Sequence, residues 1–182
     1  FTSMSVAVIT GASSGLGREY ALAVARLHPE IDEFWLIARR EEKLKQLQSL
    51  LSGKKVRTLA LDLADRASLK RYSVLLAENT PQVRPLINNA GYGALGDFSD
   101  MDLELQMGMV TLNCGTLTAM TRLTLPYMRS GSCIVNVCST AAFVPTPRWS
   151  VYCSTKAYVF SLSKALREEL KPAGIRVPAA CP

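Results

Sequence analysis

The sequence has few of the residues from which proteins build metal or disulfide sites. It contains one histidine, His28, and five cysteines that form no C-x-x-C pair. A single histidine cannot supply a usual zinc site or a histidine-activated nucleophile without many other partners. We interpret His28, just before Pro29, as a helix C-terminal cap, and the cysteines as reduced, mostly buried apolar residues. No metal site is expected.

Long apolar runs and blocks of positive charge are also missing. No apolar stretch reaches the roughly 18 residues of a membrane span, and no signal peptide is recognisable. The net charge is +6, but no lysine and arginine block with interleaved aromatics occurs. We therefore expect a cytoplasmic protein that binds neither membrane nor nucleic acid. Residues 1–182 are expected to form one domain, with Phe1 to Met4 set aside as an expression scar or frayed end.

What the sequence does contain is a regular alternation of β-branched apolar runs and amphipathic stretches. This alternation predicts an α/β fold, a Rossmann-type doubly wound parallel sheet with helices on both faces. We expect strands at residues 6–9, 33–38, 56–61, 84–87, 132–137 and 175–180. We expect helices at residues 15–27, 41–51, 66–78, 102–128 and 150–170, with Pro126 bending or ending the fourth.

A glycine-rich segment follows the first predicted strand and opens the first helix. Glycines at positions 11, 15 and 17 allow a tight turn and a close approach to a pyrophosphate, and the helix start offers free N–H groups. The alternative is a tight turn that binds nothing. The expected cofactor contacts in this segment are Thr10, Gly11, Ser13, Ser14, Gly15, Leu16 and Gly17.

The residues after the second and third strands bear on the choice of cofactor. Arg39 and Arg40 stand where an acidic residue would favour NAD. Because a guanidinium suits a 2′-phosphate, we expect NADP(H), with NAD(H) less favoured, unless the two arginines are merely solvated. Asp62, followed by Leu63, could accept a hydrogen bond from adenine or cap the helix near Arg66, and both residues are expected at the cofactor.

Two groups of asparagines lie further along the chain. Asn88 and Asn89, with Ala90 and Gly91, end the fourth strand, where small residues let a flat cofactor lie against the backbone. Asn113 lies inside the longest predicted helix although asparagine is a poor helix former. It could hold a kink and a water, or merely cap a local irregularity.

The most informative pair is Tyr152 and Lys156, which share a face of one helix shortly after Ser139. A phenol is almost fully protonated at neutral pH, so proton exchange requires a nearby cation. Lys156 is placed to be that cation, although such a pair can also be a solvated surface pair. A thiol nucleophile at Cys138 or Cys153 is disfavoured because no histidine lies nearby in sequence.

Taken together, these motifs resemble the single-domain branch of the short-chain dehydrogenase/reductase family. The resemblance rests on residues 10–17 and 88–91, Asn113, Ser139, Tyr152 and Lys156. It implies strand order 3-2-1-4-5-6-7 and hydride transfer between NADP(H) and a carbonyl or secondary alcohol. It also implies a homodimer or homotetramer formed through the long fourth and fifth helices.

The resemblance further implies a role for each residue of the catalytic set. Tyr152 is the general acid/base, and Ser139 orients and polarises the carbonyl or alcohol. Lys156 favours the phenolate form of Tyr152 and binds the nicotinamide ribose, and Asn113 holds a water in the proton relay. A nucleotide-binding regulatory or interaction protein of the same fold is the alternative. A relative acting as an epimerase or dehydratase is less favoured.

The match stops at Pro182, where the family continues with a substrate lid and a seventh strand. We therefore expect the sheet to end at its sixth strand, in a chain that is C-terminally incomplete relative to the family. Residues 92–96 and 141–149 remain to line a substrate pocket, and they are largely apolar with Arg148 as the one charge. Arg148 either meets an acidic substrate or faces water.

Overall fold

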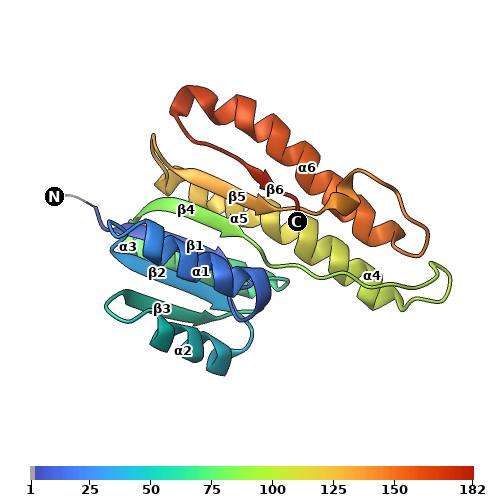
Figure 1. The fold of residues 1–182 in the computed structure, drawn as a ribbon, viewed down its shortest axis with the longest axis horizontal. Coiled ribbons are helices and arrows are strands. Elements are labelled where there is room, and N and C mark those ends of the chain that lie inside the picture. Colours follow the sequence, from blue (N-terminus) through green and yellow to red (C-terminus); the bar gives the residue numbers. More distant parts are fainter. Residues whose placement is uncertain (1–2) are drawn as a thin grey trace.

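Six parallel strands form the predicted Rossmann-type sheet in the order β3-β2-β1-β4-β5-β6, which confirms the expected fold and strand order (Figure 1). The computed structural model describes residues 3–182, so the expectation for Phe1 and Thr2 lies outside the described residues. The strands are β1 (Ser5–Thr10), β2 (Glu33–Ala38), β3 (Lys55–Ala60), β4 (Gln82–Asn88), β5 (Cys133–Val137) and β6 (Ala179–Ala180).

Helices cover both faces of this sheet. One face packs against α1 (Gly15–Leu27) and α2 (Glu41–Leu50), and the other against α3 (Arg66–Asn79), α5 (Leu117–Thr124) and α6 (Ser150–Leu170). The remaining helix, α4 (Leu103–Val110), packs beside α6 (Figure 1). Successive apolar side chains of β1 and β2 point to opposite faces of the sheet, so these two strands contribute to the core on both sides.

The long helix expected at residues 102–128 is not one continuous α-helix. A π-helical turn, η1 (Thr111–Thr116), separates α4 from α5, and a 3₁₀ turn, η2 (Leu125–Tyr127), ends it at Pro126. The proline behaves as expected, since it lacks the N–H that would continue the helix. The π-helical turn contains Asn113, so the expected irregularity lies where a poor helix former occurs.

The sixth strand is shorter than the predicted range of 175–180. Backbone N–H groups of β5 and of Cys138 donate to the carbonyls of Arg176, Pro178 and Ala180 at 2.8, 3.0 and 2.7 Å. Pro178 has no N–H to donate in return, so the ladder is interrupted and regular pairing is limited to β6. The prediction of a six-residue strand was wrong for this reason.

A buried pair of asparagines links the two central strands β4 and β5. Asn88 and Asn136 lie opposite each other in the parallel register, and Nδ2 of Asn88 donates to Oδ1 of Asn136 at 2.9 Å. The same Nδ2 donates to Thr121 Oγ1 at 3.0 Å, and Asn136 Nδ2 donates to Ser163 Oγ at 2.9 Å. The pair therefore connects the sheet to α5 and α6 through hydrogen bonds that water does not reach.

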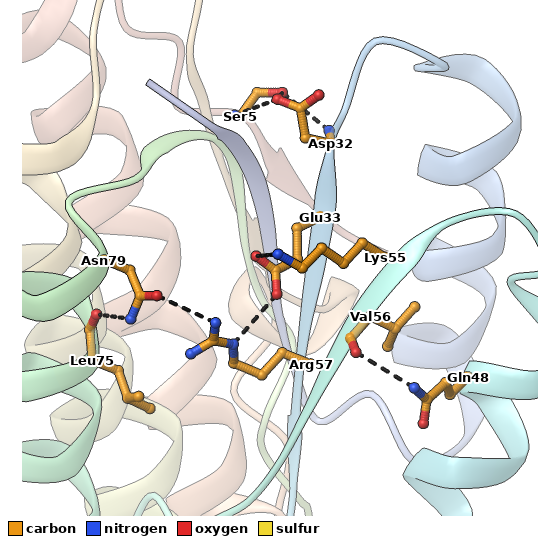
Figure 2. A network of polar contacts seen from close by, with 9 residues as sticks. All are labelled: Ser5, Asp32, Glu33, Gln48, Lys55, Val56, Arg57, Leu75 and Asn79. Atoms are coloured by element: carbon orange, nitrogen blue, oxygen red, sulfur yellow. Dashed lines mark hydrogen bonds and ion pairs between the residues drawn. The ribbon is translucent and has the colours of Figure 1, made fainter. Parts of the chain in front are cut away.

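A second polar network lies at the start of β2 and β3 (Figure 2). The buried carboxylate of Glu33 lies 3.3 Å from Arg57 Nε and 3.9 Å from Lys55 Nζ. Arg57 also donates to Asn79 Oδ1 at 3.2 Å and covers the Trp35 ring at 5.2 Å from its centroid. Since parallel strands place their carboxyl ends at the opposite edge, this network lies away from the predicted ligand site.

Candidate functional site

A cleft of about 740 Å³ opens at the carboxyl ends of the central strands. Its size is typical of a pocket for a cofactor. Most of the residues predicted to contact a cofactor line it: Gly11, Ser13, Ser14, Leu16, Arg39, Arg40, Asp62, Leu63, Asn89, Ala90 and Gly91. The prediction did not include Ile37, Ala38, Leu61, Ala64, Tyr92, Gly108 and Leu112, which line it as well.

The turn between β1 and α1 has the geometry of an anion cradle. Gly11 and Gly15 have φ angles of 61° and 55°, the left-handed region in which glycine is favoured. A Cβ on Gly17 would collide with the Gly11 carbonyl, so a side chain there would open the turn. Ser14 precedes the helix without capping it through its side chain, which leaves the first N–H groups of α1 free for a phosphate.

Thr10 does not line the cleft but holds together the two strand ends that do. Its buried Oγ1 accepts hydrogen bonds from the backbone N–H groups of Asn89 and Ala90, both at 3.0 Å. Asn89 Nδ2 in turn donates to the Gly11 carbonyl at 3.0 Å. The glycine-rich turn and the loop after β4 are therefore one rigid wall of the cleft.

Positive charge lies at one end of the cleft. Both arginines after β2 are exposed, and Arg40 Nη2 donates to the hydroxyls of Ser13 and Ser14 at 3.2 and 3.1 Å. Arg39 and Arg40 both line the cleft, which places two guanidinium groups beside the phosphate turn.

Asp62 also lines the cleft, and its carboxylate accepts from the Ala64 N–H at 3.1 Å. The N-terminal cap of α3 is Asp65, which accepts from the Ala67 N–H at 3.2 Å. The alternative interpretation of Asp62 as that helix cap was therefore wrong.

Asn113 has every polar group of its side chain engaged. Oδ1 accepts from the Tyr92 N–H at 3.0 Å, and Nδ2 donates to the Tyr92 carbonyl at 2.9 Å and to Thr155 Oγ1 at 3.0 Å. The side chain thus joins the loop after β4 to α6 through the π-helical turn. Thr155 was missed from the sequence, because nothing in a threonine between Tyr152 and Lys156 indicates a partner 42 residues away.

Tyr152 and Lys156 face each other on α6 but do not line the cleft themselves; Lys156 lies next to Gly91, which does. The Lys156 ammonium is 5.8 Å from the Tyr152 ring centroid and donates to the Val137 carbonyl at 3.0 Å. A Cβ on Gly91, which lines the cleft, would lie 2.7 Å from Asn113 Oδ1 and 3.9 Å from Lys156 Nζ. Burial lowers the pKa of Lys156, and the neighbouring thiols of Cys138, Cys114 and Cys181 oppose that shift.

Ser139 begins the 3₁₀ turn η3 (Thr140–Ala142), and its Oγ accepts from the Ala141 N–H at 3.1 Å. This turn packs against α6, the helix that carries Tyr152 and Lys156. Because Oγ is the acceptor in that bond, the hydroxyl proton of Ser139 is free to be donated elsewhere.

The five cysteines are free thiols. Burial raises the pKa of Cys114 and Cys133, and it raises the pKa of Cys138 to about 11. A raised pKa reduces the fraction of reactive thiolate, which is opposite to what a catalytic thiol requires. Within residues 3–182 no cluster of three or more His, Cys, Asp or Glu side chains has the arrangement of a metal site.

A comparison with protein families decides the affiliation. The family model described as short chain dehydrogenase matches residues 5–182. This chain belongs to the short-chain dehydrogenase family. The family's members are oxidoreductases, and the strand order of this short-chain dehydrogenase agrees with that membership. None of the helices described in residues 3–182 could cross a membrane.

This short-chain dehydrogenase is similar to curated proteins that are longer. It is 33% identical over 186 residues to "Very-long-chain 3-oxoacyl-CoA reductase" of Bos taurus, a match that covers 97% of this chain and 58% of the relative. The chain thus spans less than two thirds of the length of that relative.

Solved structures of the family superpose closely on this short-chain dehydrogenase. The bulky-bulky ketone specific alcohol dehydrogenase from Comamonas testosteroni is 32% identical with a TM-score of 0.88, over 100% of this chain and 73% of that one. A short-chain dehydrogenase from Sphingobium yanoikuyae in complex with NADPH is 35% identical with a TM-score of 0.86, over 96% and 69%. One from Burkholderia phymatum in complex with NAD is 26% identical with a TM-score of 0.88, over 100% and 67%.

Proposed function

We propose that this protein is an NADP(H)-dependent oxidoreductase that interconverts a carbonyl compound and the corresponding secondary alcohol, with Tyr152 as general acid/base. The observation that carries the proposal is the meeting of Asn113 and Lys156 at Gly91, on the cleft that runs from the free start of α1. This arrangement supports the proposal because the anion cradle and the Lys156 ammonium, which faces the Tyr152 ring, lie at the two ends of one row of residues that line or border the cleft.

The structure offers a cradle that fits a dinucleotide. The free N–H groups at the start of α1 would bind the pyrophosphate, and the small residues Ala90 and Gly91 leave room for a flat ring against the backbone. Lys156 would bind the ribose next to the nicotinamide. When bound, the cofactor supplies the hydride acceptor or donor.

The protein's own residues would manage the proton and the charge on oxygen. In the direction of reduction, the Tyr152 hydroxyl gives its proton to the carbonyl oxygen as the alcohol forms, and the phenolate regains a proton from solvent. The Ser139 hydroxyl, whose proton is free, donates a hydrogen bond to the same oxygen. The Lys156 ammonium stabilises negative charge on the Tyr152 oxygen.

Asn113 would serve the proton relay through its backbone. Its side chain is fully occupied by Tyr92 and Thr155, so a relay water would bind the backbone carbonyls of the π-helical turn. The side chain would fix the position of that turn.

A preference for NADP(H) over NAD(H) is supported by Arg39 and Arg40, which line the cleft beside the phosphate turn. A guanidinium can bind a 2′-phosphate through two parallel hydrogen bonds and by charge. The short-chain dehydrogenases of similar structure include one in complex with NADPH and one in complex with NAD. The choice in this chain therefore depends on its own arginines.

Assembly into a homodimer or homotetramer is supported by exposed apolar residues on α4, namely Leu103, Leu105, Met107 and Val110. Exposed apolar side chains that gather on one short helix are typical of a protein interface. A cytoplasmic location stays a prediction, and the five free thiols are compatible with it.

The test of the proposed function is turnover of a panel of carbonyl compounds by the full-length protein with NADPH, followed by absorbance of the reduced nicotinamide. Tyr152→Phe should lower turnover roughly 100- to 10,000-fold while NADPH binding, measured by calorimetry, is nearly unchanged. Tyr158→Phe, in the same helix, is the matched control. Turnover that survives Tyr152→Phe would contradict the assigned role.

A further inference from the structure

An indole packs directly on the proposed acid/base. The ring centroids of Trp149 and Tyr152 are 5.4 Å apart, and the two planes are inclined by 56°. Trp149 precedes α6, and its carbonyl accepts from the Cys153 N–H at 2.8 Å, so its backbone is fixed by the helix start. Tyr152 therefore presents its ring beside a second large aromatic surface.

Gly93 packs against both rings. A Cβ at this position would lie 2.8 Å from Tyr152 Cδ2, closer than such atoms approach one another, and a tight 3.2 Å from Trp149 Cζ3. The loop after β4 can reach the two rings only because residue 93 has no side chain. We call Gly93, Trp149 and Tyr152 the aromatic corner.

The residue next to Trp149 has a disfavoured backbone conformation. Arg148 has a φ of 66°, which residues with a Cβ rarely adopt. Its carbonyl accepts from the Gly96 N–H at 3.0 Å, and its Nε lies 3.2 Å from Asp97 Oδ1. These contacts join residues 92–97 to residues 143–149 and hold Trp149 in place. Disfavoured conformations of this kind persist where surrounding contacts impose them, often at functional sites.

The same contacts decide the electrostatic character of the corner. Arg148, the one charged residue in 141–149, is exposed and lies beside the Asp97 carboxylate, which compensates part of its charge. Beside this ion pair the two joined loops expose three large apolar side chains, Leu95, Phe143 and Val144, which are 54%, 53% and 62% exposed. Of the two interpretations of Arg148, the structure does not favour contact with an acidic substrate.

We propose that Trp149 is a specificity-determining residue that holds an uncharged, bulky apolar group of the carbonyl substrate beside Tyr152, and that Asp97 and Arg148 are positioning residues for it. The proposal rests on the proposed function, because it names the substrate class of that site. Trp149 exchanges no proton. It contributes an apolar surface on which a bulky substituent of the substrate packs, whereas a small substituent does not reach it.

The first test compares an aryl ketone with a small aliphatic ketone, using NADPH and the full-length protein. Trp149→Ala should lower kcat/KM for the aryl ketone roughly 10- to 100-fold and for the small ketone less than about threefold, whereas Trp149→Phe should keep most of the preference. Leu27→Ala, on the exposed end of α1, is the control. An equal loss for both ketones, or no loss for either, would overturn the proposal.

The second test measures binding without turnover, so that it is independent of the proposed chemistry. The chain has two tryptophans, and the other one, Trp35, is fully buried in the core. In the presence of NADP⁺ the aryl ketone should quench the intrinsic fluorescence of the wild type, and Trp149→Phe should abolish that quenching. Absence of quenching in the wild type would overturn the proposal. Quenching without turnover of any carbonyl with NADPH would instead refute the proposed function alone.

The positioning role has its own readout. Asp97→Asn should raise KM for the aryl ketone roughly three- to tenfold while kcat and its pH profile stay nearly constant, because the acid/base is untouched. Lys45→Ala, which breaks the exposed Lys45–Glu41 pair on α2, is the matched control. A fall in kcat with unchanged KM would overturn the role of the ion pair.

Discussion

The side chain of Asn113 binds both backbone polar groups of Tyr92, its Oδ1 accepting from the N–H at 3.0 Å and its Nδ2 donating to the carbonyl at 2.9 Å. This reciprocal pair resembles the pairing of two strands, but it joins a loop to a helix. It explains why an asparagine is buried in a helix, where this residue is otherwise unfavourable. The side-chain amide forms the hydrogen bonds that the Tyr92 backbone does not form with a neighbouring strand.

We expect Asn113→Ala to lower the free energy of unfolding by about 2–3 kcal/mol, because it leaves the Tyr92 N–H, the Tyr92 carbonyl and the Thr155 hydroxyl without this partner in a buried region. Urea denaturation measures the change. Gln46→Ala, on the exposed side of α2, is the control. A destabilisation no larger than that of the control would contradict a structural role for the amide.

Replacing Arg39 with glutamine should weaken NADPH binding roughly 10- to 100-fold and NADH binding less than about threefold, because a guanidinium that binds a 2′-phosphate has no partner in NADH. Calorimetric titration of each reduced cofactor gives both dissociation constants. Lys45→Gln removes a positive charge from the same helix region without touching the cleft. Equal weakening of both cofactors would remove the argument for NADP(H).

We expect the buried ammonium of Lys156 to lower the stability of the folded protein although turnover requires it. Burial lowers the pKa of Lys156 below its value of 10.5 in an unfolded chain. Between those two pKa values the unfolded chain binds more protons, so this group's contribution to stability is complete above 10.5 and is lost as the pH falls through the folded pKa.

Lys156→Met should therefore raise the free energy of unfolding of the cofactor-free protein by about 1 kcal/mol near pH 7, with a difference that shrinks toward pH 10.5, and should abolish turnover. Thermal unfolding across that pH range measures it. A variant that is less stable than the wild type by the same amount at every pH would contradict the prediction.

Cys138, the residue before Ser139, should react slowly with alkylating reagents. Burial raises the pKa of Cys138 from 9.0 to about 11, so its thiolate fraction near pH 8 should be about 100-fold below that of a free thiol. Mass spectrometry after iodoacetamide treatment should find Cys138 unlabelled in the folded protein and labelled in urea. Labelling of the folded protein at the rate of a free thiol would contradict the inferred environment.

Local signals in the sequence were sufficient for the fold and for most of the cleft. Alternating strands and helices predicted a parallel sheet with helices on both faces, and the glycines of residues 10–17 predicted the phosphate turn, because each signal acts within a few residues. The strand order came from the family resemblance. The length of β6 was not predicted correctly. Pro178 lies inside the predicted range and interrupts the ladder because it has no N–H to donate.

What could not be predicted depends on contacts between distant segments. The π-helical turn at Asn113 depends on the loop at Tyr92. Tyr92 lines the cleft, and its hydroxyl fits beside Gly108 because that residue has no side chain. The ion pair between Arg148 and Asp97 likewise joins residues 51 positions apart, and it changes the chemistry expected of the substrate region. Periodicity carries no information about such pairs.

The hydrogen bond between the Asn88 and Asn136 side chains affects the register in which β4 and β5 pair. If β5 shifted by one residue so that Asn88 faced Val137 and Asn136 faced Ile87, both amides would lose a partner in the dry interior. Without these two polar side chains, the apolar side chains of β4 and β5 would be compatible with several alignments. Asn88 and Asn136 therefore favour the observed alignment of β4 and β5 over that shifted one.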